Sequence, residues 1–96
     1  MLGVTEQELN IIKSIIQPYK DEYKFFVYGS RVKGNFRPLS DLDLMIKGKT
    51  HTNLNDIENL KDDFDNSNLS YVVNIADYYN LSESFYDIIK KDLVEI

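Results

Sequence analysis

The sequence predicts an α+β (α/β) fold in which three to four strands form one small sheet with helices packed on it. Two observations predict it. Apolar residues recur at helical spacing in two long segments, and short runs rich in β-branched and aromatic residues lie between and after them. Ninety-six residues suffice for one core, and no repeat or linker interrupts them, so residues 1–96 are expected to form a single domain.

The first expected element is a helix that begins after Thr5. Thr5 and Glu8 have the spacing of a capping box, in which each side chain accepts a hydrogen bond from the backbone N–H of the other residue. Pro18 ends this helix, because proline cannot donate to the preceding turn. The stripe expected to face the core consists of Leu9, Ile12 and Ile16.

Strand and helix patterns alternate along the rest of the chain. Residues 24–28 form an aromatic and β-branched run that predicts a strand, and residues 41–44 predict a second strand after a returning loop. The remaining expected elements are a helix from Leu54 to about Asp65, a strand from Leu69 to Ile75, a helix capped by Asn80 or Ser82, and a short closing strand at Leu93–Val94.

Two aspartates one residue apart give the second strand its chemical interest. Asp41 and Asp43 alternate with Leu42 and Leu44, so in an extended strand both carboxylates leave one face and both leucines the other. Same-face neighbours on a strand lie roughly 6.5 to 7 Å apart at Cα. Short carboxylates at that separation can converge on divalent ions, and Mg²⁺ prefers oxygen ligands.

A turn precedes these aspartates at Gly29 and Ser30. Glycine permits a sharp bend at the end of the first strand, where backbone N–H groups and the serine hydroxyl can be offered to a phosphate. Together, the bend and the two carboxylates predict metal-assisted chemistry on a nucleoside triphosphate.

These residues also carry a family resemblance. The run Gly29-Ser30-Arg31-Val32-Lys33-Gly34, followed by Ser40-Asp41-Leu42-Asp43-Leu44, resembles the signature of the minimal nucleotidyltransferases (MNT) of the DNA polymerase β superfamily. The resemblance implies a small mixed β-sheet with helices packed on it and transfer of a nucleoside monophosphate from an NTP, with pyrophosphate leaving. It implies that Asp41 and Asp43 are catalytic and metal-binding, and that the nucleotide or phosphate is bound by Gly29, Ser30, Arg31, Lys33 and Ser40.

The resemblance further implies cofactors and a partner. The expected cofactor is Mg²⁺, with two ions in a fully active site and one in this chain, and the expected substrate is an NTP, with ATP favoured. Many such small proteins are antitoxins paired with an all-helical HEPN protein, and some adenylylate a tyrosine of that toxin. The resemblance therefore predicts a HEPN-type partner as acceptor.

The third strand departs from the family pattern. There the family carries a third carboxylate in a sequence like Val-Asp-Leu-x-Asp, but the matching stretch here has Asn74 at that position. An amide carries no charge and cannot act as a general base. Asp77 has the opposite strand parity, so it is expected to cap a turn or face solvent. Two functions remain open: an active transferase, or a catalytically weakened antitoxin that binds nucleotide and neutralises its partner by binding alone.

Charge and composition exclude other classes. Sixteen acidic against eleven basic residues give a net charge of −5, which argues against direct nucleic-acid binding. The balance reverses locally, because the stretch from Arg31 to Lys49 holds five basic residues and two acidic ones, a positive collar that would steer a triphosphate.

Cysteine and histidine usage narrows the possible metals. The chain has no cysteine and a single histidine, His51, expected to be solvated in a polar turn, so oxygen-ligated metals are the expected kind. The sequence shows no signal-peptide pattern and no 18-residue apolar segment, so we expect a cytoplasmic protein without membrane contact.

Overall fold

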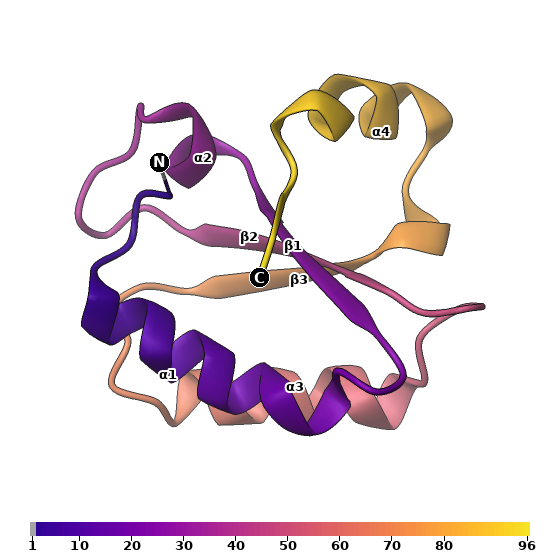
Figure 1. Ribbon diagram of the computed structural model, residues 1–96, viewed down its shortest axis with the longest axis horizontal. Coiled ribbons are helices and arrows are strands. Elements are labelled where there is room, and N and C mark those ends of the chain that lie inside the picture. Colours follow the sequence, from indigo (N-terminus) through magenta and orange to yellow (C-terminus); the bar gives the residue numbers. More distant parts are fainter. Residues whose placement is uncertain (1) are drawn as a thin grey trace.

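Four strands form one sheet in the order β3-β2-β1-β4 (Figure 1). β1 (Lys24–Tyr28) is antiparallel to β2 (Leu42–Lys47) and to β4 (Val94–Glu95), whereas β3 (Val73–Asp77) runs parallel to β2. The sheet is therefore mixed, as the sequence predicted. This computed structural model describes residues 2–96.

Two long helices cover one face of the sheet, the lower one in Figure 1. α1 (Glu6–Ile16) begins with the predicted capping box and continues into a short 3-10 helix, η1 (Gln17–Tyr19). α3 (Leu54–Asp65) is capped by the side chain of Asn53. Both helices turn their apolar stripes toward the sheet.

The opposite face carries the C-terminal helix, α4 (Glu83–Ile89). Ser82 caps it by accepting a hydrogen bond from the Phe85 N–H, which decides between the two predicted caps. The short elements are α2 (Ser30–Lys33), η2 (Tyr78–Asn80) and η3 (Lys90–Asp92).

Four sequence predictions need correction. The second strand begins at Leu42 and extends to Lys47, so Asp41 directly precedes it. The third strand begins at Val73 rather than Leu69 and extends to Asp77, because β2 begins at Leu42 and offers no ladder partner to earlier residues. The closing strand lies one residue later than expected, at Val94–Glu95. The loop that returns to the aspartates begins with one helical turn, α2, which ends at Gly34 in the left-handed conformation.

The residues of β2 divide the interior into two parts. Leu42, Leu44 and Ile46 are fully buried beneath α1 and α3, and we call this side of the sheet the core face. Asp43, Met45 and Lys47 alternate with them on the other side, which we call the site face. There Met45 packs with Tyr28 and Ile89 in a smaller core under α4.

Several apolar residues of the helices remain at the surface. Leu54 on α3 is 76% exposed, and Phe85 and Ile88 on α4 are also exposed. Among residues 2–96, no helix combines the length and apolar character that a membrane span requires.

Candidate nucleotide site

The sharp bend after β1 lies against one of the two aspartates. Gly29 has a φ of 81°, a conformation that favours glycine, and a Cβ there would collide with Oδ2 of Asp43. The β1–β2 register explains this approach, because Tyr28 lies opposite Asp43. The bend and the carboxylate therefore come together, as the sequence predicted.

Asn74 joins both carboxylates from the neighbouring strand. The parallel register places Asn74 beside Asp43 on the site face. Its side-chain nitrogen donates hydrogen bonds to Oδ2 of Asp41, at 3.1 Å, and to Oδ1 of Asp43, at 3.2 Å. One amide thus holds two anionic groups close together, where they would otherwise repel each other.

The composition of this cluster suits a hard cation. Asp41 and Asp43 offer carboxylate oxygens, the ligands that Mg²⁺ prefers, and their shared contact with one nitrogen shows that they converge. Within residues 2–96, no three Asp, Glu, His or Cys side chains gather into a possible metal site. The third position is neutral, so the two aspartates would hold a cation with one carboxylate fewer than the family pattern supplies.

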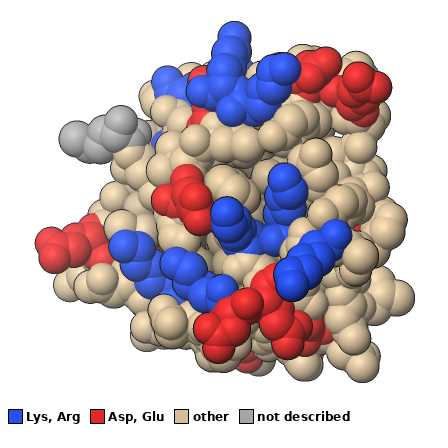
Figure 2. Space-filling view, turned by 45° about the vertical axis from the view of Figure 1, so that its right-hand side comes forward, with Lys and Arg blue, Asp and Glu red and all other residues tan. Residues whose placement is uncertain are grey.

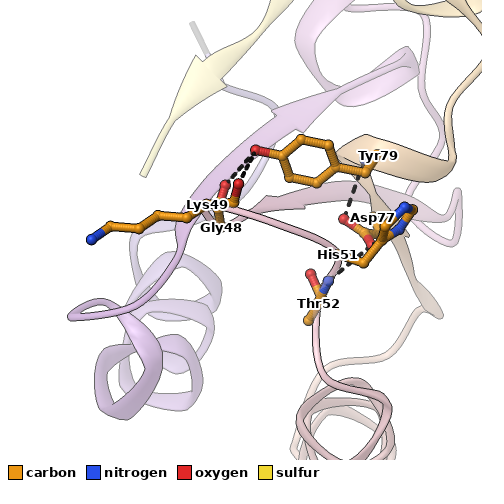
Figure 3. A network of polar contacts seen from close by, with 6 residues as sticks. All are labelled: Gly48, Lys49, His51, Thr52, Asp77 and Tyr79. Atoms are coloured by element: carbon orange, nitrogen blue, oxygen red, sulfur yellow. Dashed lines mark hydrogen bonds and ion pairs between the residues drawn. The ribbon is translucent and has the colours of Figure 1, made fainter.

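Asp77 lies away from this cluster and has a structural role. It pairs with Ile46, at the other end of the β2–β3 ladder, and is 5% exposed. As Figure 3 shows, its carboxylate accepts hydrogen bonds from the Thr52 and Tyr79 N–H groups. The prediction of a cap at Asp77 is confirmed and that of solvent exposure is wrong, because it joins the loop before α3 to η2.

The side chain of His51 is exposed, as predicted, but it is not free of partners. Its Nδ1 lies 3.3 Å from Oδ2 of Asp77 (Figure 3). The neighbouring Tyr79 hydroxyl donates to the carbonyl oxygens of Gly48 and Lys49. These contacts fix the loop after β2 and lie at the opposite end of the strand from Asp43.

Arg31 turns inward, although its place in the motif suggested a phosphate contact. Its side chain is 2% exposed, and its guanidinium donates to the carbonyl oxygens of Gly3 (2.7 Å), Ser40 (3.0 Å) and Pro38 (3.0 Å). Its Cζ lies 3.7 Å from the centre of the Tyr71 ring. Arg31 therefore braces the loop that leads into Asp41 and ties it to the N-terminal segment.

Ser40 and Lys33 have different surroundings. The Ser40 hydroxyl accepts a hydrogen bond from the Arg37 N–H at 2.8 Å, so it closes a turn of the same loop. The Lys33 side chain is half exposed, and its ammonium group lies 4.0 Å from the Asp92 carboxylate. Of the basic residues in the motif, Lys33 is the one whose charge remains accessible.

The positive collar predicted between Arg31 and Lys49 is divided by the fold. Arg31 is buried beside the bend, whereas Lys47 ends β2 and Lys49 follows it in the loop at the far end of the sheet. Sequence proximity therefore overstated the positive charge near the aspartates.

Two tyrosines report on the electrostatics around this region. Burial raises the pKa of Tyr28, and the neighbouring Asp43 carboxylate raises it further. Burial, with a further contribution from the Glu8 carboxylate, raises the pKa of Tyr71 to about 12. From its sequence Tyr71 is expected in the core or at an interface, and the structure buries it in the core; its contact with Arg31 was not foreseen, because nothing in the motif indicates that the two side chains pack together.

A mixed sheet with a Gly-Ser bend against Asp43, and with Asp41 directly before the same strand, is the arrangement that the family resemblance implied. The family model described as "Polymerase beta, Nucleotidyltransferase" matches residues 10–95, and the chain belongs to this family. It is a nucleotidyltransferase of the polymerase β superfamily, and it is of the minimal type whose signature the sequence resembles.

One relative supports this family, and one solved structure supports the fold. The chain is 37% identical over 95 residues to "Probable protein adenylyltransferase MntA" of Haemophilus influenzae, with 99% of this chain and 83% of that protein covered. A solved structure described as "a putative nucleotidyltransferase from Sulfolobus solfataricus" has a TM-score of 0.52 and 23% identity, with 93% of this chain and 78% of that one covered. This second likeness concerns the fold alone.

Proposed function

We propose that this chain binds ATP at the Gly29–Ser30 bend and transfers its adenylyl group to a side-chain hydroxyl of a protein partner. The approach of Gly29 to the Asp43 carboxylate is the observation that carries the proposal, because it puts the bend that would bind phosphate next to the acidic pair. The relative named as a protein adenylyltransferase supports ATP as donor and a protein as acceptor.

The proposed roles follow from each residue's surroundings. Gly29 lets the backbone approach the phosphates, and Ser30 opens α2, in which the Val32 and Lys33 N–H groups already donate to the Gly29 carbonyl, so the Ser30 hydroxyl is the group offered to a phosphate. Asp41 and Asp43 would hold Mg²⁺, which when bound offsets the charge of the polyphosphate. Lys33 supplies accessible positive charge, while Arg31 and Ser40 position the loop before Asp41.

The transfer step makes one bond and breaks another. The acceptor oxygen bonds to the α-phosphorus of ATP, the bond from that phosphorus to the β-bridging oxygen breaks, and pyrophosphate leaves with the electron pair. The hydroxyl proton passes to a site carboxylate or to water, because the amide of Asn74 cannot accept it. Transfer is therefore slow in this chain relative to a site with a third carboxylate.

A second function is favoured by Asn74 itself. Its amide donates a hydrogen bond to each carboxylate and so holds the two together without a cation. The site can therefore keep its shape for binding even where transfer is weak. In this alternative the chain is an antitoxin that neutralises its partner by binding alone, with or without nucleotide.

We propose the same kind of partner in both cases, an all-helical HEPN-type toxin in an MNT/HEPN pair. This partner is what membership of the minimal nucleotidyltransferases implies, and a protein acceptor agrees with the name of the relative. The chain itself would be the antitoxin of the pair.

Labelled ATP distinguishes the two functions. The chain and its co-purified partner are incubated with Mg²⁺ and ATP labelled on either the α- or the γ-phosphate. Adenylyl transfer predicts that only the α-label reaches the partner, and that Asp41→Asn prevents it. Nucleotide binding and neutralisation without label on the partner would favour the binding function, and transfer of the γ-label would contradict nucleotidyl transfer.

A further inference from the structure

A hollow with four lysines lies at the end of the sheet away from the bend. It has a volume of about 360 Å³ and opens between the turn before β1 and the loop after β2. We call it the basic hollow, and its principal lining residues are Lys20, Lys24, Phe26, Lys47 and Lys49. Figure 2, with this end of the molecule turned forward, shows Lys and Arg side chains gathered over the middle of the visible face.

The lysines come together at a cost in stability. Lys24 and Lys47 are direct partners in the β1–β2 register, and like charges in such cross-strand pairs are destabilising. Lys47 is held over the ring of Tyr78, with its ammonium group 4.2 Å from the ring centre. Such an arrangement offers positive charge to a binding partner in exchange for some stability of the fold.

Protein carboxylates offset this charge only in part, because the hollow has four lysines against two acidic residues in its lining and Glu95 opposite Phe26 in the β1–β4 register. Asp21 and Glu22 also line the hollow, but in the part of the chain that the structure describes, none of its four lysines forms an ion pair within 4.0 Å. The surrounding chain is acidic, with a net charge of −5, so this concentration of lysines is a local exception. An anionic partner would therefore be directed to this place.

The basic hollow shares a face of the sheet with the nucleotide site. Asp43, Met45 and Lys47 succeed one another on the site face, which puts the Cα atoms of Asp43 and Lys47 roughly 13 Å apart. α4 covers Met45, which lies between these two residues, and leaves its own Phe85 and Ile88 exposed. A protein with its acceptor hydroxyl near Asp43 would therefore reach the hollow with a segment only a few residues away.

We propose that the basic hollow docks an acidic segment of the protein that accepts the adenylyl group. This inference rests on the proposed function, since it assumes a protein acceptor. A short acidic segment fits the observations better than a nucleic acid, because the hollow is confined and bordered by Asp21 and Glu22, and a net charge of −5 repels a long phosphate backbone.

The test uses a fluorescent peptide rich in glutamate and aspartate as the probe. We expect the wild-type chain to bind it more weakly at 200 mM than at 50 mM salt. Lys24→Glu combined with Lys47→Glu should weaken binding at least about ten-fold. The matched control, Lys61→Glu with Lys91→Glu, makes the same charge change on exposed residues elsewhere and should stay within about two-fold.

A single substitution separates docking from folding. Lys24→Glu would place opposite charges across the β1–β2 pair, so it should raise the melting temperature while it weakens peptide binding. A merely misfolded variant would lose both. Calorimetry with Mg-ATP reports on the nucleotide site independently. If the wild-type chain bound the peptide but not Mg-ATP, that result would count against the proposed function alone.

Three outcomes would overturn the docking proposal. The first is equal peptide affinity in the hollow and control variants. The second is tighter binding of an RNA oligonucleotide of the same charge, which would assign the hollow to nucleic acid. The third is self-association that disappears in the Lys24→Glu/Lys47→Glu variant, which would assign it to a second copy of the chain.

Discussion

The two faces of the sheet are built from alternate residues of the same strands but have different purposes. On β2, Leu42, Leu44 and Ile46 are fully buried beneath two long helices. On the other face, Asp43 and Lys47 carry charge, and only Met45 between them is buried. One strand thus anchors the core with one set of side chains and presents a candidate site with the other.

The difference shows where the molecule gives up stability. The core face buries apolar surface and so contributes most of the favourable free energy of folding. The site face keeps two carboxylates around one amide and two lysines opposite each other, arrangements that folding alone does not favour. Substitutions on the two faces should therefore separate stability from function.

The largest expected effect comes from restoring the third carboxylate. Asn74→Asp would supply a charged group able to accept the proton of the acceptor hydroxyl, and we expect transfer to the partner to rise by about 10²- to 10⁴-fold. The free energy of unfolding should fall, because three carboxylates then meet without an amide. The measurement is the initial rate of α-label transfer with saturating Mg-ATP.

Asn74→Ala serves as the control for that substitution, since it removes the amide without adding a base. If Asn74→Asp leaves transfer unchanged while Asp41→Asn abolishes it, the third position has been assigned to the wrong residue.

A substitution on the core face should lower the stability of the fold without changing nucleotide binding. Leu44→Ala removes a fully buried side chain and should lower the free energy of unfolding by about 2–5 kcal/mol. Below the melting temperature, the affinity for Mg-ATP should be unchanged. Denaturant unfolding measures the first quantity, and Leu54→Ala, at a position that is 76% exposed, should cost less than about 0.5 kcal/mol. A similar loss at both positions would contradict the division of β2 into two faces.

Arg31 stabilises the fold and positions the loop that leads into the site, so its replacement should affect both stability and activity. Arg31→Lys keeps the charge but cannot reproduce the planar set of donors, and it should cost about 1–3 kcal/mol of stability. The loop before Asp41 would lose its brace, so KM for ATP should rise more than kcat falls. A direct phosphate contact would instead leave stability nearly unchanged, and thermal unfolding beside steady-state kinetics distinguishes the two roles.

The smallest expected effect is a loss of stability in alkali. Burial first, and Glu8 second, raise the pKa of Tyr71 to about 12, above the ordinary value of 10.0. The native state therefore retains this proton more tightly than the unfolded chain. Its contribution to stability is complete below pH 10 and declines as the pH rises toward 12. Denaturant unfolding across this range should show a shallower decline in Tyr71→Phe, and equal slopes would contradict the assignment.

Local patterns were enough to predict most of the fold. The capping box at Thr5, the strand alternation of β2 and the helix from Leu54 to Asp65 are all confirmed, because each depends on neighbours within a few residues. Asn74 lies beside Asp43, where the family resemblance put the third position, and strand parity kept Asp77 off that face. The start of β3 was predicted wrongly, since it depends on where its partner strand begins.

The surroundings of the site depended on contacts that sequence spacing does not contain. Arg31 was expected at a phosphate, but the N-terminal segment and Tyr71 enclose its guanidinium from distant parts of the chain. The burial of Asp77 arises from a loop 25 residues earlier, at Thr52. The basic hollow likewise assembles two separate turns and two strands, which only the antiparallel register brings together.

The central claim is that the Gly29–Ser30 bend and the two aspartates form one nucleotide site, and calorimetry with Mg-ATP tests it most directly. We predict a measurable heat of binding for the wild-type chain and its loss in Asp43→Asn, with the same melting temperature within a few degrees. The control Asp62→Asn, on the exposed surface of α3, should bind like the wild type. No heat from wild-type protein with Mg-ATP, GTP, CTP or UTP, or equal binding by Asp43→Asn, would contradict the account.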